Sequence, residues 1–325
     1  MQIIRFPLAG NIRGARTVGY RYSDLDRKNL RLFSKDTSRA TLMTIQVVAG
    51  QLRGLGDVRL DMAYPITAIA GRNGTGKSTL LALAACAFHN DVDGFNPLNR
   101  KNPYYTFSDF FIQDPEEISP AGIGICYQIN HDKWLRGSSG PGWQARMKRR
   151  AGRWTNYDRR VDRNVVFLGH ERVVPHSERS VSKSYRRRFR NLPQDSCADQ
   201  VCQISSRIVG KRYEKLWYKG HARYRLPMAT DHRGTYSGFN MGAGESAVYE
   251  ILSTICGTDK SLLVVIDEIE LGLHEDAQAK LIDELKTLCA KRRLQVICSP
   301  ILQEYLRAYP QRRDSFLNAR RLARS

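Results

Sequence analysis

The chain contains 325 residues, a length that suits two average domains or one enlarged α/β domain with insertions. Hydrophobic residues make up 42% of it and aromatic residues 9%, which excludes a wholly disordered, collagen-like or coiled-coil protein. The 52 Lys and Arg residues against 32 Asp and Glu residues give a formal net charge of +20. This excess favours a polyanionic partner such as nucleic acid or phosphate groups, with a merely basic, soluble surface as the alternative.

The cysteines and the apolar runs indicate the compartment. There are seven cysteines, an odd number without a Cys-x-x-Cys pair, so the sequence indicates neither a disulfide framework nor a zinc cage. Apolar runs stay well below the roughly 18 residues of a membrane span, and residues 1–5 do not begin a signal peptide. We therefore expect a cytoplasmic protein with reduced thiols and no membrane partner.

The first elements lead to a strand, loop and helix. Residues 1–40 are basic and polar and carry no chemical motif, so we interpret them as an N-terminal extension. Two β-rich runs, 43–48 and 58–62, are separated by glycines and predict antiparallel strands. The apolar run 66–70 predicts a short strand that ends at a glycine turn, and residues 78–88 are rich in helix formers.

The middle of the chain, residues 131–234, has a different composition. Between Lys133 and Arg190 there are 17 Lys or Arg residues and 4 Asp or Glu residues. One apolar run, 165–169, predicts a core strand inside this basic insert.

Two basic clusters flank that strand. The first contains Arg146, Lys148, Arg149, Arg150 and Arg153, and the second contains Arg186, Arg187, Arg188 and Arg190. They would neutralise a phosphate backbone, which makes nucleic acid a possible partner through 146–153 and 186–190. An acidic protein partner and a solvated face remain alternatives. The Trp residues nearby would either stack on single strands or anchor a small core.

The last part of the chain alternates helices and strands. A glycine-rich turn and helix (240–256), an apolar strand (262–266), a helix (about 275–291) and another strand (294–298) follow one another. This alternation predicts a parallel sheet covered by helices.

The segment Gly71–Ser78 fits the phosphate-loop pattern GxxxxGK[ST], and it lies between a predicted strand and a predicted helix, as that mechanism requires. Its backbone N–H groups and the helix N-terminus would surround phosphates, Lys77 would reach the β and γ phosphates, and Ser78 would bind Mg²⁺. The nucleotide-binding residues predicted here are Gly71, Arg72, Asn73, Gly74, Thr75, Gly76, Lys77, Ser78 and Thr79.

Two acids follow the apolar run 262–266. Ligands of open α/β sheets bind at the carboxyl ends of the strands, where Asp267 and Glu268 would lie. Asp267 is placed to hold Mg²⁺, and Glu268 to orient and deprotonate the water that attacks the γ-phosphate. A solvated acidic pair after a core strand is the alternative.

A third segment, 240–247, opens a helix before the acidic strand. Its residues Gly242, Ala243, Gly244 and Glu245 expose backbone N–H groups at a helix N-terminus, where a second phosphate surface could bind. A helix-initiating turn without a ligand is the alternative interpretation.

The order of these pieces resembles the ABC-type ATPases of the group that includes RecF, SMC and the OLD-type nuclease ATPases. In particular it is similar to a branch of small bacterial AAA-type ATPases with a Gly-Ala-Gly-Glu signature and a Glu-Leu-Gly-Leu-His turn, here residues 270–274. The resemblance covers residues 42–88 and 235–300.

The resemblance implies the fold class, an α/β ABC-type P-loop ATPase with a mixed sheet core, an antiparallel β subdomain and a basic inserted region. Residues 41–130 would form the N-terminal half of the ATPase domain with its Walker A motif. Residues 131–234 would be the insert, and 235–325 the C-terminal half with signature, Walker B motif and D-loop.

It also implies a head-to-head pair that binds ATP and Mg²⁺. ATP on 71–79 of one copy would be capped by Met241–Glu245 of the other, with Glu268 and Lys77 catalytic. Residues 269–274 would match the D-loop that crosses between the sites. A surface or capping histidine is the alternative for His274.

The sequence departs from the family at two places. Gly242 replaces the signature hydroxyl of many ABC proteins, which leaves backbone N–H groups for the γ-phosphate. Residues 298–300 read Cys-Ser-Pro where a switch histidine is usual, so either turnover is slow or residues are missing there. Gln113 is the candidate for the glutamine that contacts nucleotide in this family. Arg172 would lie near the ligand edge, as a salt-bridged residue or a nucleotide contact.

The function implied is that of an ATP-driven dimerising switch, the sensor or regulatory subunit of a bacterial anti-phage defence complex with a separate effector such as a nuclease. The short stretch after residue 298 predicts no attached TOPRIM nuclease. A RecF-like DNA-repair ATPase and a structural assembly subunit with little turnover are the alternatives.

Overall fold

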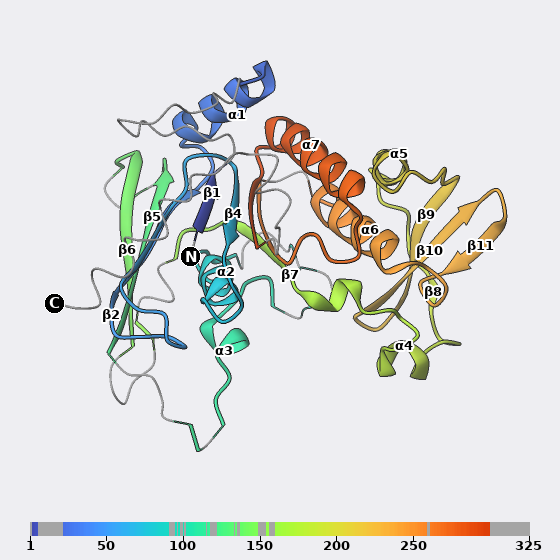
Figure 1. Ribbon diagram of the computed structural model, residues 1–325, viewed down its shortest axis with the longest axis horizontal. Helices are drawn as coiled ribbons and strands as arrows, with labels where there is room; N and C mark the ends of the chain where they lie inside the picture. Colours follow the sequence, from blue (N-terminus) through green and yellow to red (C-terminus); the bar gives the residue numbers. More distant parts are fainter. Residues whose placement is uncertain are drawn as a thin grey trace.

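The computed structural model describes residues 22–90, 102–114, 122–132, 137–148, 160–258 and 261–299, the backbone of 2–5, and positions 95, 97, 100, 116–117, 134 and 154–155. In these parts of the chain the strands form three sheets, a central one and two four-stranded ones. Figure 1 shows the two smaller sheets at opposite ends of the molecule, with the central sheet between them.

The central sheet is mixed, as the family resemblance implies. Its order is β1 (Gln2–Arg5), β4 (Ile66–Ala70), β13 (Gln295–Ser299), β12 (Leu262–Asp267) and β7 (Asn164–Leu168). The strands β4, β13, β12 and β7 run parallel, and β1 pairs antiparallel with β4. The carboxyl ends of β4, β12 and β7 therefore meet at one edge of the sheet.

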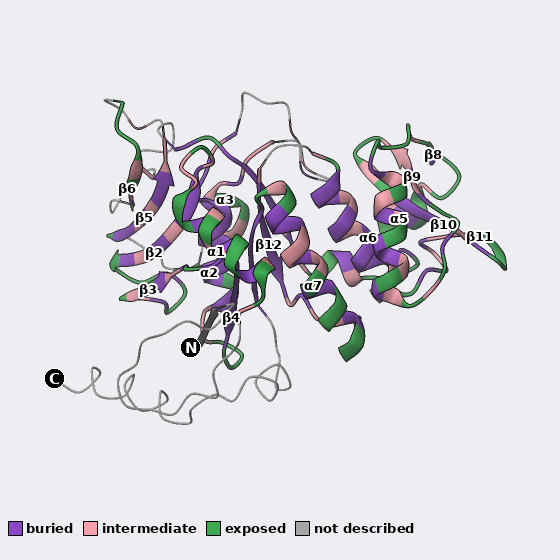
Figure 2. Ribbon diagram, turned by 90° about the horizontal axis from the view of Figure 1, so that it is seen from above, coloured by how far each residue is buried: buried purple, intermediate pink, exposed green. Residues whose placement is uncertain are grey.

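Alternate side chains of β12 enter two separate cores. Leu262, Val264 and Ile266 join the core formed with helices α5 (Ala198–Val209), α6 (Ala243–Cys256) and α7 (Glu275–Arg292). Leu263 and Val265 join the core that contains helix α2 (Lys77–Ala85). The central sheet is thus covered on both faces, which explains its continuous apolar strands (Figure 2).

An antiparallel sheet covers the α2 side. Its order is β3 (Val58–Asp61), β2 (Thr41–Ala49), β5 (Ile123–His131) and β6 (Gly140–Lys148). The predicted antiparallel pair is confirmed as β2 and β3, while β5 and β6 extend it as a hairpin. The first part of the predicted basic insert therefore belongs to this sheet.

The third sheet contains β11 (Gly234–Ser237), β10 (Tyr224–Asp231), β9 (Lys215–His221) and β8 (Arg190–Asn191). It packs on α5 and α6, where the ring of Tyr218 stacks on that of Tyr249 with centroids 4.6 Å apart. Three short elements complete the fold: α3 (Phe107–Phe110), the 3-10 turn η1 (His170–Val173) and α4 (Ser180–Ser184). No helix in the described ranges is both long enough and apolar enough to span a membrane.

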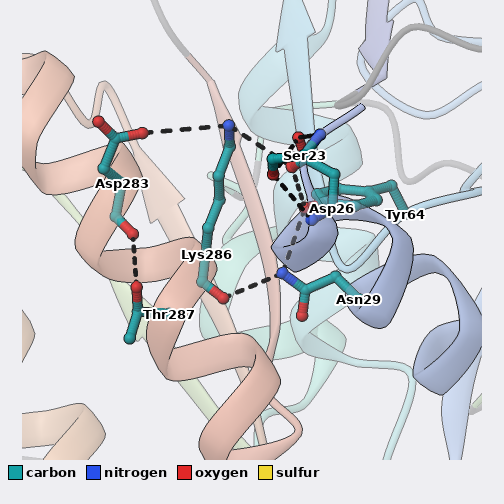
Figure 3. Close-up of polar contacts among 7 residues, drawn as sticks. All are labelled: Ser23, Asp26, Asn29, Tyr64, Asp283, Lys286 and Thr287. Carbon is teal, nitrogen blue, oxygen red and sulfur yellow. Dashed lines mark hydrogen bonds and ion pairs between the residues drawn. The ribbon is translucent and has the colours of Figure 1, made fainter. Parts of the chain in front are cut away.

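Parts of residues 1–40, interpreted above as an extension, are joined to the central fold. Strand β1 lengthens the central sheet, and helix α1 (Asp24–Lys35) docks on α7 (Figure 3). Asp26 is buried and accepts hydrogen bonds from the Tyr64 hydroxyl (3.1 Å) and from Ser23, whose side chain caps the helix. The Lys286 ammonium lies 3.6 Å from Asp26.

We predict that Asp26→Asn lowers the free energy of unfolding by about 3 kcal/mol, because it removes the charge that compensates the nearly buried Lys286 ammonium. Urea titration measures this change. The matched control is Asp283→Asn: that carboxylate also lies near Lys286, at 4.0 Å, but is 78% exposed, so its loss costs at most about 0.5 kcal/mol. Equal effects of the two changes would contradict the role given to Asp26.

Candidate nucleotide site

The predicted phosphate loop connects β4 to α2. Gly74 and Gly76 adopt positive φ angles of 77° and 88°, and Gly76 is the N-cap of the helix. A Cβ on Gly76 would lie 2.9 Å from Cδ1 of Leu55, so the loop needs glycine there for two reasons. The predicted strand, loop and helix are all confirmed.

The N-terminus of α2 has the features of an anion site. Among the described residues, no side chain caps it and its first turn holds no acid. Lys77 is 8% exposed, and its ammonium donates to the carbonyl oxygens of Gly71 (2.8 Å) and Arg72 (3.1 Å). Ser78 is exposed beside it, whereas Thr79 is buried. Free N–H groups, a helix dipole and a lysine therefore converge on this loop.

The acidic pair ends β12, at the same sheet edge as the phosphate loop. Asp267 is 6% exposed, and its Oδ1 accepts a hydrogen bond from the Ser299 hydroxyl on β13. The same hydroxyl accepts the Glu268 N–H at 2.9 Å. Glu268 has a φ of 50°, a left-handed conformation that is uncommon for residues other than glycine.

The segment after β7, the strand on the other side of β12 from β13, holds the backbone of Asp267 and Glu268. The buried Arg172 guanidinium donates to the carbonyl oxygens of Gly169 (2.8 Å), Asp267 (2.7 Å) and Glu268. Burial lowers the pKa of Arg172. The hydrogen bonds of Arg172 thus go to backbone carbonyl oxygens, and its contact with a nucleotide remains a prediction. His170 Nε2 lies 3.0 Å from Glu268 Oε2.

A lysine that the sequence did not single out fixes the Gly-Ala-Gly-Glu turn. Glu245 Oε2 accepts the N–H of Gly242 at 3.2 Å, and its Oε1 lies 3.0 Å from the Lys211 ammonium. Lys211 also contacts Asp231 Oδ2 (3.0 Å) and the Tyr236 hydroxyl (2.6 Å). Burial lowers the pKa of Lys211, but these hydrogen bonds outweigh it and raise that pKa overall.

The signature turn rests directly on the predicted D-loop turn. A Cβ on Gly244 would lie 2.2 Å from the Gly272 carbonyl oxygen, so only glycine allows this backbone contact. Gly272 itself has a φ of 77°. His274 caps α7, accepting the N–H of Ala277 on Nδ1 at 3.3 Å, as its alternative interpretation expects.

The helices that begin at the two glycine-rich turns cover opposite faces of the central sheet. Helix α2 belongs to one core and α6 to the other, and Figure 1 shows them well apart. The fold of one chain therefore assembles the phosphate loop with the acidic pair and leaves the signature turn on the far face.

Gln113 is exposed in the segment that follows α3. That segment is attached to the turn after β2, because the Arg53 guanidinium donates to the Phe110 carbonyl oxygen at 2.8 Å and lies 5.1 Å from the Phe111 ring centroid. The predicted nucleotide contact of Gln113 remains a prediction.

The two basic clusters differ in exposure. Arg146 is 1% exposed on β6, and its guanidinium binds the Gln144 side chain at 2.9 Å, so the prediction that it contacts a polyanion is wrong. Arg149, Arg150 and Arg153 lie outside the described residues. Arg186, Arg187, Arg188 and Arg190 are exposed around α4 and β8.

Comparison with known proteins assigns the fold. Residues 148–299 match the family described as "AAA domain, putative AbiEii toxin, Type IV TA system". The structure superposes on an SMC head, in a crystal structure of "the SmcHead bound to the C-winged helix domain of ScpA", with a TM-score of 0.51 and 13% identity over 82% of this chain and 91% of that one. The chain has the fold of the SMC head, an ABC-type P-loop ATPase fold.

Two further SMC heads superpose on the chain with lower TM-scores. The head domain from Thermotoga maritima has a TM-score of 0.42 and 13% identity over 83% of this chain and 92% of that one. The head from Pyrococcus furiosus, bound to the C-terminal domain of ScpA, has a TM-score of 0.49 and 11% identity over 83% and 91%. No curated protein matches the sequence at a significant level.

Three side chains that hold the site were not assigned from the sequence. Ser299 lies within the Cys-Ser-Pro departure, and His170 stands just before Arg172 at the end of a predicted strand. Ser299 ends β13 and His170 follows β7, the two strands that neighbour β12, and this position is the signal that could have identified them. Lys211 gives no such signal, because its partners lie 20 and 34 residues farther along the chain.

We predict that Gly244→Ala lowers the free energy of unfolding by about 1–3 kcal/mol, because the added methyl group meets the backbone of Gly272. Thermal or urea unfolding measures this. In the control, Gly242→Ala, the new Cβ comes no closer than 3.8 Å to its nearest neighbour and φ is −61°, so the loss stays within about 1 kcal/mol. If the two variants were equally stable, the contact between the turns would be unimportant.

Proposed function

We propose that this chain is an ABC-type ATPase that binds and hydrolyses ATP with Mg²⁺ between two copies of the chain and works as a nucleotide-driven switch. The observation that supports hydrolysis best is the shared sheet edge, where the loop carrying Lys77 follows β4 and the acids Asp267 and Glu268 follow β12. A solvated acidic pair does not account for an aspartate that is 6% exposed.

The residues present fit a triphosphate with its metal ion. The uncapped N-terminus of α2 and the loop Gly71–Thr79 would hold the phosphates, and Lys77 would neutralise their charge. Ser78 and Asp267 would hold Mg²⁺, since hydroxyl and carboxylate oxygens are ligands that it prefers. Bound ATP supplies the phosphoanhydride that water cleaves.

At the acidic pair, some side chains hold the backbone and another would take part in the chemistry. Ser299 and Arg172 fix the backbone there, so that Asp267 and Glu268 keep their directions. The Glu268 carboxylate, 24% exposed, would accept the proton of the attacking water.

A second copy would complete the site. Residues Met241–Glu245 begin a helix on the face of the sheet opposite α2, which favours contact with the phosphate loop of another chain. With Gly242 as the N-cap, backbone N–H groups of the turn would face the nucleotide.

The partner of the switch would be a separate effector protein, such as a nuclease, in a cytoplasmic anti-phage defence complex. Residues 148–299 match a family described by a type IV toxin–antitoxin system, and this match supports a role beside a separate protein of such a system. The solved SMC head bound to a winged-helix domain of ScpA shows that a head of this fold can bind a partner protein.

A RecF-like role with nucleic acid is the second candidate. It is supported by the exposed residues Arg186, Arg187, Arg188 and Arg190, which surround a small group of aromatic rings. The Tyr185 ring lies 4.6 Å from His221 and 6.0 Å from Tyr224. Exposed arginines beside aromatic rings can hold phosphates and stack bases.

We predict that Glu268→Gln lowers ATP turnover at least about 100-fold and accumulates as an ATP-bound dimer, because an amide cannot accept the proton. Lys77→Ala loses ATP binding, since the loop loses its ammonium. Phosphate release and light scattering after gel filtration measure both effects. The control Glu284→Gln, which changes an α7 carboxylate paired with Arg207, keeps wild-type turnover. Equal and substantial turnover in all variants would refute hydrolysis at this site.

For the second candidate, we predict that replacing Arg186, Arg187 and Arg188 by Ala weakens binding to single-stranded DNA and lowers the slope of log affinity against log salt by about 2. ATP turnover stays near wild type. The control replaces Lys28, Arg31 and Lys35, which are exposed on α1, and removes the same charge. Fluorescence anisotropy at several salt concentrations distinguishes the two. Equal weakening by both triple variants would indicate a general charge effect and no site.

A further inference from the structure

His170 lies beside the acidic pair and has no role in the function proposed above. It is the first residue of η1, directly after β7 and Gly169. Its Nε2 lies 3.0 Å from Glu268 Oε2 and 3.9 Å from Asp267 Oδ2. In the described part of the chain, His170 is the one side chain with an ion-pair or hydrogen-bond contact to the Glu268 carboxylate.

The backbone around His170 is fixed relative to Glu268. Strands β7 and β12 pair in parallel up to Leu168 and Ile266. This is the last pair before His170 on one strand's continuation and the acidic pair on the other. Arg172, two residues after His170, then ties Gly169 to the carbonyl oxygens of Asp267 and Glu268. Turn η1 also packs against α6, which further restricts the backbone that bears the His170 imidazole.

We propose that His170 is a positioning residue whose imidazole Nε2 pairs with Glu268 Oε2, 3.0 Å away, and fixes the direction of that carboxylate. The remaining oxygen is then aimed to accept a proton from water. The inference rests on the proposed ATP hydrolysis. It does not rest on stability, because the His170 side chain is 55% exposed and an exposed pair contributes at most about 1 kcal/mol to folding.

The contact is tested in the nucleotide-free protein by NMR of labelled histidine rings. The His170 ring signals, assigned by their absence in His170→Gln, shift in Glu268→Gln and stay unchanged in the control Glu284→Gln. Identical His170 signals in wild type and Glu268→Gln would overturn the proposal. This measurement involves no turnover, so it is independent of whether ATP is hydrolysed.

The consequence is tested by steady-state kinetics. His170→Ala lowers kcat by about 10- to 100-fold while KM for ATP stays within twofold, because a misdirected carboxylate affects the chemical step and leaves the phosphate loop intact. His170→Gln recovers most of the loss, since its amide N–H can reach the same oxygen. The control is His232→Ala, at the exposed tip of the β10–β11 hairpin, which keeps wild-type kcat.

Each kinetic outcome supports or overturns the positioning role of His170. A kcat within twofold of wild type in His170→Ala, or a rise in KM with unchanged kcat, would overturn the positioning role. Failure of His170→Gln to recover activity would also count against it. Wild-type turnover in Glu268→Gln would instead refute the proposed hydrolysis, while the NMR contact would be judged on its own result.

Discussion

The site depends on how the chain is held at the end of β12. There the buried Arg172 guanidinium binds the carbonyl oxygens of Asp267 and Glu268, and Ser299 binds the Glu268 N–H and the Asp267 carboxylate. Burying a guanidinium is costly unless its donors find acceptors, and backbone carbonyl oxygens accept hydrogen bonds from both terminal nitrogens of Arg172 without neutralising the acids. A positive φ at Glu268 is maintained because both neighbouring strands hold its peptide groups.

The signature turn is tied to the same region by backbone contact. Gly244 rests on Gly272, a few residues after the acidic pair, so a displacement of α6 and a displacement of the D-loop turn are coupled by steric exclusion. Lys211 extends this coupling to the third sheet, because it joins Glu245 of the signature turn to Asp231 on β10. The sheet that carries the exposed arginines is therefore connected to the turn proposed to meet the nucleotide of a second copy.

Sequence alone predicted the elements whose pattern is local. The run 66–70, the phosphate loop and the run 262–266 were identified correctly because glycine geometry, helix formers and continuous burial leave direct marks in the sequence. Helix α1 and the place of β1 in the central sheet were missed, since both depend on partners far away, Lys286 for Asp26 and Ile69 for Ile3. The predicted polyanion contact of Arg146 was wrong for a related reason. A basic cluster in the sequence shows charge and does not show direction, and the alternation of side chains along β6 turns this arginine inward.

The missing switch histidine acquires a physical meaning in this arrangement. At the end of β13 the position is occupied by Ser299, whose hydroxyl is fully engaged by Asp267 and the Glu268 N–H. A short hydroxyl can bind the backbone of its neighbour strand, but an imidazole there would displace these contacts. An imidazole lies instead just after β7, the other neighbour of β12, where His170 contacts the side chain of Glu268. Ser299, at the end of β13, thus fixes the backbone and the Asp267 carboxylate, and His170, after β7, contacts the Glu268 carboxylate. Either strand beside the central strand of a parallel sheet can therefore supply a side chain to this edge.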